Sequence, residues 1–265
     1  MTYPLLILLK VVTNKNHFIE LQAGNDGYLW VTLHSGSRNL GSTVCDYYHN
    51  VAIKLNHKWR SNIPCDDLAF LPVDSHEGLS YLQAMHFALD FALENRKRMM
   101  QRVKDTIRGV FRHIVRHIVE FTEEINIHHN YAAKERHFGK DVWIHRKGAT
   151  LAEKGTKGVI PGSQGSFTYI VEGLGNRDSF NSCSHGAGRK MGRMEACRTL
   201  DKAECEKSME GILYDGFGAV KRKKKTMVDL GEAPSAYKDI DEVMEAQSDL
   251  VKIVVKLKPL AVVKG

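Results

Sequence analysis

The chain has 265 residues, 43% of them hydrophobic, and a formal net charge of +7 at pH 7. A chain of this length can bury a full hydrophobic core, as one large domain or two small ones. No apolar run approaches the roughly 20 residues that span a bilayer, so the sequence predicts a soluble protein without a membrane partner. The excess of basic residues is compatible with a polyanionic partner.

The first predicted element is an apolar segment over residues 1–10. It lacks a preceding basic region and a cleavage site of small residues, so we expect a strand or a truncated edge of the core rather than a leader. The strand over 28–33, rich in aromatic and β-branched residues, would deliver His34 at its end. Helical spacing of apolar residues predicts a helix over 42–55 and long helical stretches from 76 to about 121.

Four more segments follow: strands over 142–144 and 168–171, a helix over 189–210, and a last helix over 236–257 before a terminal strand. The third of these would place the loop around His185 at a helix N-terminus, where free amides favour a phosphate. There is no internal repeat or long linker. The fold class expected is therefore α/β (α+β), one unit over residues 1–265 with mixed sheets, flanking helices and chemistry on the connecting loops.

The most informative motif is Ser182–Arg189, Ser-Cys-Ser-His-Gly-Ala-Gly-Arg. It places His185 among residues with little side-chain bulk, which lets a phosphate or nucleotide approach the backbone amides. Arg189 can supply the forked positive charge that phosphate oxygens prefer. A simple tight turn is the alternative explanation for the glycines.

This motif belongs to a series in fixed order. The others are Asn16–Glu20 (NHFIE), His34–Gly41 (HSGSRNLG), His128–Tyr131 (HHNY), His145–Thr150 (HRKGAT), Ile160–Gly165 (IPGSQG) and the closing Val262–Gly265 (VVKG). Together they resemble the RtcB family, GTP-dependent RNA ligases that join a 3′-phosphate or 2′,3′-cyclic phosphate end to a 5′-hydroxyl end. The resemblance extends from about Val11 to Gly265.

The resemblance implies a role for each matching position. His185 would be the catalytic nucleophile that carries GMP from GTP. The guanylate-contacting positions would be Asn16, His17, Phe18, Ile19, Glu20, His129, Asn130, Pro161, Gly162, Ser163, Gln164, Thr168, His185, Gly186, Ala187, Gly188 and Lys264. Two Mn²⁺ ions would be bound, one by His17 and the other by His34 and His129.

One departure from the family pattern affects the metal sites. The family carries an Asp-x-x-Cys element whose cysteine bridges both metals, and the printed sequence has no counterpart. We therefore expect an N-terminally truncated family domain in which both Mn²⁺ sites are incomplete. A separate N-terminal polypeptide is the partner that could supply the missing donors.

Basic side chains are the candidates for binding RNA. Four residues are candidates for binding RNA or nucleotide phosphates: Arg38, Arg146, Lys147 and Arg189. The run Lys221–Lys225 can contact RNA phosphates or form a solvated hairpin tip. Five cysteines at irregular spacing, without Cys-x-x-Cys, indicate reduced thiols and a cytoplasmic location.

Three functions remain open on the sequence alone. The first is a GTP-dependent RNA ligase that joins a 3′-phosphate or 2′,3′-cyclic phosphate end to a 5′-hydroxyl end. The second is a non-catalytic guanylate- or RNA-binding remnant, or one half of a split ligase. The third, a metal-dependent phosphodiesterase using only the histidines, is less favoured because the Ser-His-Gly-Ala-Gly loop would then have no purpose.

Overall fold

A computed structural model describes residues 17–222 and 225–264. It divides the chain into two compact units. The first contains the described parts of Met1–His34 and Ile127–Gly265, and the second is Ser35–Asn126. The fold combines helices with antiparallel sheets, as the α+β class predicts.

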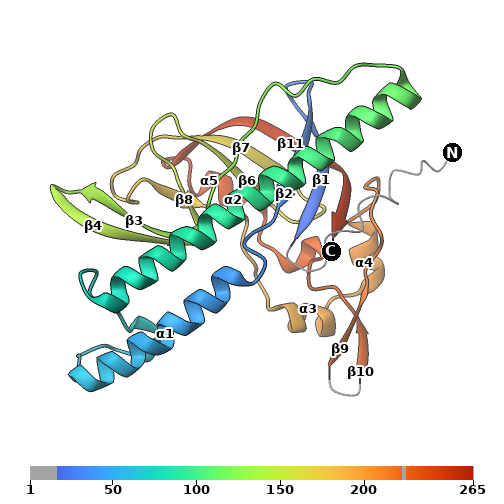
Figure 1. The fold of residues 1–265 in the computed structure, drawn as a ribbon. Coiled ribbons are helices and arrows are strands. Elements are labelled where there is room, and N and C mark those ends of the chain that lie inside the picture. Colours follow the sequence, from blue (N-terminus) through green and yellow to red (C-terminus); the bar gives the residue numbers. More distant parts are fainter. Residues whose placement is uncertain (1–16, 223–224, 265) are drawn as a thin grey trace. The chain divides into compact units, whose positions relative to one another are not determined.

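The first unit is built on a five-stranded sheet, visible in Figure 1. Its strands in spatial order are β2 (Leu29–His34), β1 (Phe18–Gly24), β11 (Val251–Lys264), β7 (Thr168–Gly173) and β6 (Lys157–Pro161). Every neighbouring pair is antiparallel. The long strand β11 lies at the centre, because it pairs with β1 through its second half and with β7 through its first half.

Three smaller ribbons complete the β-structure of this unit. They are the hairpin of β3 (Asn130–His137) and β4 (Lys140–Lys147), the pair of β5 (Ala149–Leu151) and β8 (Ser182–Ser184), and the hairpin of β9 (Ala219–Arg222) and β10 (Lys225–Val228). The basic run Lys221–Lys225 thus crosses the β9–β10 turn, as its hairpin interpretation predicts. Residues 223–224 are outside the described part of the chain, and the RNA-contact alternative for this run stays a prediction.

The short helices of the first unit are α3 (Arg193–Thr199), α4 (Lys202–Lys207) and α5 (Ile240–Glu245), with a 3₁₀ turn, η4, at Pro234–Ala236. A buried cluster joins α5 to the sheet through Met244, Tyr169 and Val171. Cys183 and Ala187 belong to the same cluster. The segment on either side of His185 is therefore anchored in the hydrophobic core, while His185 itself is only partly buried.

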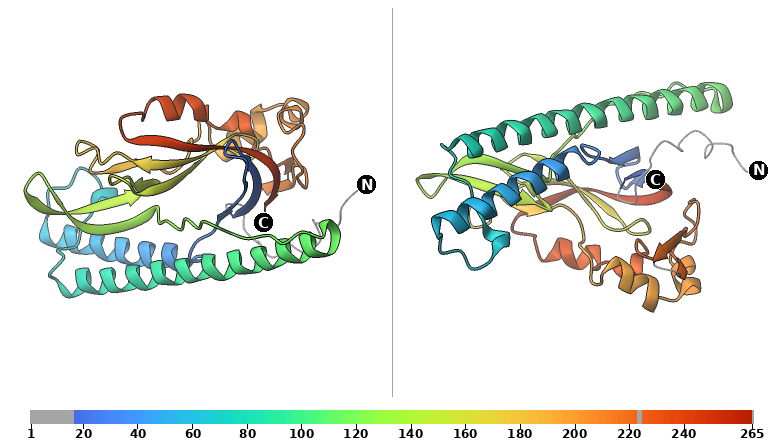
Figure 2. Two further views of the ribbon diagram at one scale, coloured as in Figure 1. Left: turned by 90° about the horizontal axis from the view of Figure 1, so that it is seen from above. Right: turned by 60° about the horizontal axis from the view of Figure 1, so that its bottom comes forward.

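The second unit consists of α1 (Leu40–Trp59) and α2 (His76–Val110), which lie side by side in Figures 1 and 2. A 3₁₀ turn, η2 (Asp66–Leu68), lies in their connection. Ser75 caps α2, because its Oγ accepts a hydrogen bond of 3.0 Å from Gly78 N. After α2 a π-helical turn, η3, covers Phe111–Val115.

Most of the predicted elements are confirmed. The predicted strands 28–33, 142–144 and 168–171 correspond to β2, β4 and β7, and the predicted helix 42–55 lies within α1. The helix that starts at His76 is confirmed as far as Val110, and the π-helical turn replaces its predicted continuation toward 121. Residues 1–10, predicted as a strand or core edge, lie outside the described residues.

Two predicted helices do not form as continuous helices. In 189–210, the backbone is extended at Gly192 and again at Leu200 and Asp201, so only α3 and α4 form. In 236–257, α5 stops at Glu245 and β11 begins at Val251. The β-branched run Val251–Val255 explains the second error, because such side chains suit a pleated strand better than a helix.

Among the described residues, no helix is long and apolar enough to cross a membrane.

Candidate active site

Four aromatic rings form a continuous series in the first unit. Phe18 stacks on His34 with ring centroids 5.3 Å apart, and His34 lies 5.2 Å from His129. His129 in turn stacks on His185 at 5.1 Å, with the two planes only 14° apart. The structure therefore brings together three histidines that are separated by 95 and 56 positions in the chain, counted from His34 to His129 and on to His185.

Strand register explains how this series arises. Phe18 of β1 pairs directly with His34, the last residue of β2, and on its other side with Lys264 of β11. Directly opposed residues in antiparallel strands face the same side of the sheet. His129 comes immediately before β3, and His185 comes immediately after β8. Each histidine is therefore held at the end of a strand, as the sequence predicts for His34.

His185 lies against the backbone of Gly148. A Cβ atom on Gly148 would be 3.2 Å from Cε1 of His185, and Gly148 has a φ of +69°. A side chain at this position would be strained and would also press on the imidazole. Burial lowers the pKa of His185, an effect opposed by a hydrogen bond with the Gly148 backbone. The imidazole is therefore neutral near pH 7, as a nitrogen nucleophile must be.

The predicted position of the His185 loop at a helix N-terminus is wrong. β8 delivers His185, and α3 begins only at Arg193. The loop is instead fixed to β6, because Ala187 N donates to Pro161 O at 2.9 Å. A Cβ on Gly186 would lie 3.0 Å from that same oxygen, so this close approach explains the glycine.

The turn after β6 holds three more of the expected guanylate-contacting residues. Gly162 N donates to Phe167 O at 3.0 Å, and the hydroxyls of Ser163 and Ser166 are 2.6 Å apart. Ser163 and Gln164 are buried. This turn and the His185 loop meet at Pro161, so two of the sequence motifs form one surface.

One face of the sheet carries a buried polar row. Gln22 Nε2 donates to both Glu20 Oε2 and Thr168 Oγ1 at 2.9 Å, and Thr32 Oγ1 donates to Gln22 Oε1 at 2.6 Å. Burial raises the pKa of Glu20 to about 8, despite the opposing effect of Lys264. Glu20 therefore keeps its proton through much of the neutral range.

A second polar cluster surrounds Glu232. Its carboxylate is 3.1 Å from Lys264 Nζ, 2.9 Å from Arg193 Nε and 3.3 Å from Arg189 Nη1, and it accepts a hydrogen bond of 2.5 Å from Tyr237. Burial alone would raise the pKa of Glu232, but Lys264 and the hydrogen bonds hold that pKa below its ordinary value. Burial and the neighbouring Glu232 raise the pKa of Tyr237 to about 12.

Arg189 keeps a donor available in this cluster. Its guanidinium lies over the Tyr237 ring, 4.8 Å from the centroid, and Nη1 donates to the Tyr237 hydroxyl at 3.0 Å. Within the described part of the chain, its buried Nη2 has no hydrogen-bond partner. Such a nitrogen can donate to a ligand oxygen.

Sequence reasoning did not identify Gln22, Glu232, Tyr237 or Arg193 as site residues. Alternation along β1 was the available signal for Gln22, because Phe18, Glu20 and Gln22 share one face. No local signal identifies the Glu232 cluster, whose members come from separate segments. Among the predicted contacts, Asn130 is exposed and its Oδ1 accepts from Gly148 N at 3.1 Å, while Asn16 lies outside the described residues.

The expected manganese site is only partly assembled by the described residues. His34 and His129 are neighbours, but residues 17–222 and 225–264 contain no group of three or more His, Cys, Asp or Glu side chains that could hold a metal ion. Imidazoles suit manganese and zinc alike. The described donor set therefore does not by itself fit the expected two-metal centre.

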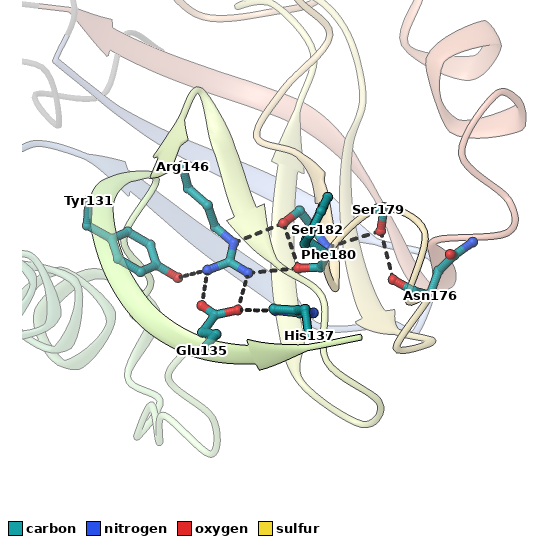
Figure 3. Close-up of polar contacts among 8 residues, drawn as sticks. All are labelled: Tyr131, Glu135, His137, Arg146, Asn176, Ser179, Phe180 and Ser182. Atoms are coloured by element: carbon teal, nitrogen blue, oxygen red, sulfur yellow. Dashed lines mark hydrogen bonds and ion pairs between the residues drawn. The ribbon is translucent and has the colours of Figure 1, made fainter. Parts of the chain in front are cut away.

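The prediction that Arg146 grips phosphates is wrong. Figure 3 shows its guanidinium enclosed by Glu135, Tyr131, Ser182 and the carbonyl of Phe180. The side chain is 1% exposed. A guanidinium in this position has no surface to offer a ligand. Of the other candidates, Lys147 is exposed at the end of β4, and Arg38 belongs to the second unit.

Comparison with known proteins shows the family of this chain. The family model described as tRNA-splicing ligase RtcB matches residues 14–265. The RNA-splicing ligase RtcB of Escherichia coli K12 is 41% identical over 94% of this chain and 59% of its own length. The tRNA-splicing ligase RtcB of Pyrobaculum aerophilum is 32% identical over 94% of this chain and 58% of its own length. The RNA-splicing ligase RtcB of Mycobacterium tuberculosis is 31% identical over 94% of this chain and 63% of its own length. The chain spans about three fifths of the length of these relatives. It belongs to the RtcB family.

Proposed function

We propose that this protein acts as a GTP-dependent RNA ligase that joins an RNA 3′-phosphate or 2′,3′-cyclic phosphate end to a 5′-hydroxyl end. The observation that carries the proposal is the setting of His185. A neutral imidazole stacks on His129, lies against a glycine backbone and precedes a glycine-rich loop, in a member of the RtcB family.

The first step is transfer of GMP to His185. A ring N–H that donates to the Gly148 backbone leaves the other ring nitrogen with its lone pair. That nitrogen attacks the α-phosphorus of GTP, a phosphorus–nitrogen bond forms, and pyrophosphate leaves. The cationic ring formed in this way releases its remaining N–H proton to water and takes a proton back when the phosphorus–nitrogen bond later breaks. Arg189 Nη2 is placed to donate to a phosphate oxygen.

The guanylate would contact the residues implied by the family resemblance. Glu20 and Lys264, on paired strands, are suited to the base, because the carboxyl group can hydrogen-bond a guanine edge. The amides of the turn after β6 and of the His185 loop are suited to the phosphate.

Five cysteines that are all free thiols are in keeping with the cytoplasmic location that we propose.

The remaining steps act on RNA. An oxygen of the RNA 3′-phosphate attacks the phosphorus of the adduct, the bond to His185 breaks, and the RNA end becomes guanylylated. The 5′-hydroxyl oxygen of a second end then attacks the 3′-phosphorus, its proton is released to water, and GMP leaves as the phosphodiester forms. A cyclic phosphate would first be opened by water. The net charge of +7 favours association with RNA.

Manganese is the metal ion that the family resemblance implies for this site. Among the described residues, His34 and His129 are neighbouring imidazoles that could donate to a divalent cation, and a separate polypeptide could supply further donors. Because the described donor set does not complete a site, no step above is assigned to a metal. This shortage is also the observation that favours the second function, a guanylate- or RNA-binding protein without ligase activity.

The deciding experiment is labelling with α-³²P GTP in the presence of manganese. We expect protein-bound label that is stable to alkali and labile to acid, as for a phosphoramidate, and absent from His185→Ala. His145→Ala is the matched control, because His145 is exposed on β4 and outside the ring series. Label that persists in His185→Ala would refute the nucleophile. GTP binding without any label would favour the non-catalytic function.

A further inference from the structure

The buried guanidinium of Arg146 uses all five of its N–H donors. Nε donates to Ser182 Oγ at 3.0 Å, and Nη2 donates to Glu135 Oε2 and to Phe180 O, both at 3.0 Å. Nη1 donates to Tyr131 OH at 3.2 Å and to Glu135 Oε1. Glu135 is also bonded to the buried His137, whose Nε2 lies 2.9 Å from Oε2. Figure 3 shows the whole network.

These bonds connect two pieces of backbone that are far apart in the chain. Glu135 and Tyr131 lie on β3 and Arg146 lies on the paired strand β4, so the ion pair is internal to that hairpin. Phe180 lies in the turn before β8, and Ser182 is the first residue of β8. Arg146 therefore links the hairpin to β8 through side-chain hydrogen bonds, in addition to the backbone pairing of β8 with β5.

The turn that Arg146 holds has an unfavourable backbone. Phe180 and Asn181 have φ values of +53° and +51°, in the left-handed region that non-glycine residues rarely adopt. Such a conformation persists only where surrounding contacts impose it. Arg146 Nη2 and Ser182 Oγ both donate to the Phe180 carbonyl, which fixes this peptide.

Both linked pieces end at the nucleophile. The hairpin begins just after His129 and is followed by Gly148, while β8 is followed by His185. Gly148 N donates to His129 O at 2.9 Å, which closes the hairpin end beside the ring series. The stacking of His129 on His185 is a contact between the same two pieces that Arg146 joins.

We propose that Arg146 is a positioning residue that sets the placement of His185 against His129 and Gly148 by tying β8 to the β3–β4 hairpin. The proposal rests on the function proposed for His185. The hydrogen bonds of Arg146 go to Glu135, Tyr131, Ser182 and the Phe180 carbonyl, and its side chain is 1% exposed, so it acts on His185 through Ser182 and Phe180. A lysine would keep the charge beside Glu135 but cannot supply the planar fork that reaches both sides.

The test compares Arg146→Lys with Arg136→Lys in the full chain. Arg136 lies on the same hairpin, but its side chain is 71% exposed and its partner is the surface residue Asp141. Three quantities are measured: the NMR shifts of the His129 and His185 ring protons, the Kd for GTP, and the single-turnover rate of His185 guanylylation.

For Arg146→Lys we expect displaced ring-proton shifts of both histidines and a GTP Kd within about threefold of the parent. The guanylylation rate should fall about tenfold to hundredfold, the size of effect that a misplacement of about 1 Å produces. Arg136→Lys should match the parent in all three. A folded Arg146→Lys protein with unchanged shifts and rate would overturn the proposal, as would loss of GTP binding in proportion to the rate.

A milder variant covers the case in which Arg146→Lys fails to fold. Ser182→Ala removes the acceptor for Arg146 Nε and leaves the buried pair with Glu135 intact. We expect the same ring-proton displacements in smaller measure, and unchanged shifts here would also overturn the proposal. The NMR comparison needs no activity. A parent chain that takes up no label therefore refutes the proposed function alone, while the shifts still decide the role of Arg146.

Discussion

The imidazoles of His129 and His185 lie face to face, 5.1 Å between centroids, although one ends a loop before β3 and the other follows β8. Burial lowers the pKa of His185, so this ring faces His129 in its neutral form. Because the two rings are stacked, a change at the start of β3 or at the end of β8 alters the surroundings of the nucleophile His185.

Gly148→Ala should slow the reaction of His185 with GTP in addition to lowering the free energy of unfolding. The added Cβ meets Cε1 of His185 at 3.2 Å and takes a φ of +69°, which costs about 1–2 kcal/mol for an L-residue. Gly139→Ala is the matched control, since its φ of +77° imposes similar strain but nothing lies within 4 Å of its Cβ. Both variants should lose similar free energy of unfolding, measured in urea.

Only Gly148→Ala should also slow labelling of the protein by GTP, by about tenfold or more. Equal labelling by the two alanine variants would show that the contact with Gly148 does not matter to the nucleophile.

Gln247 should hold the strand that delivers His185. Its Oε1 accepts from Ser184 N at 3.1 Å and its Nε2 donates to Ser184 Oγ at 2.9 Å, with the side chain buried. Gln247→Leu leaves that amide without its acceptor, which typically costs about 1–3 kcal/mol. We expect this loss in the free energy of unfolding, together with slower guanylylation. The exposed Gln83→Leu is the control. A Gln247→Leu protein as stable as the parent would contradict this assignment.

The sequence predicted strands better than helices for identifiable reasons. β2 and β7 contain β-branched and aromatic runs bounded by polar residues, which is a local signal. The predicted helix 189–210 does not begin at Arg189, because the backbone there pairs with Tyr237 across the fold, a contact that no local pattern encodes. Helical spacing at 193–207 was correct only as two short pieces divided at Asp201, whose side chain caps α4.

The site was predictable to the extent that its residues lie in motifs. The family resemblance implied that His185 is the nucleophile and that His34 and His129 bind a metal ion, and the structure places the three rings in one series. The burial of Arg146 was not predictable. An arginine between a histidine and a lysine in a strand resembles a phosphate ligand, and its partners Glu135 and Ser182 are recognisable only once the hairpin and β8 are paired.

The isolated chain should bind fewer than two manganese ions with high affinity. His34 and His129 are the neighbouring pair, and two or three imidazoles without an anionic bridge leave two adjacent cations uncompensated. Metal content after equilibrium dialysis, measured by mass spectrometry, checks this, and His34→Ala should lower it further while His145→Ala should not. Two tightly held ions per chain would show that other residues replace the expected ligands.

Glu20 should make the protein less stable as pH rises from about 4.5 to about 8. Its pKa in the folded state is about 8, raised by burial from 4.5, so over this interval the native protein keeps a proton that the unfolded chain has released. The contribution is fully present below pH 4.5 and is lost as pH rises through 8, with a slope near 1 kcal/mol per pH unit from this group.

Glu20→Gln cannot ionise and keeps an acceptor for Gln22. The free energy of unfolding of this variant should therefore equal that of the parent near pH 4.5 and exceed it at pH 8. Urea denaturation across this range, with the exposed Glu153→Gln as control, measures the difference. Parallel pH profiles for parent and Glu20→Gln would show that Glu20 is ionised in the folded protein, and a base contact by its protonated form would then have to be abandoned.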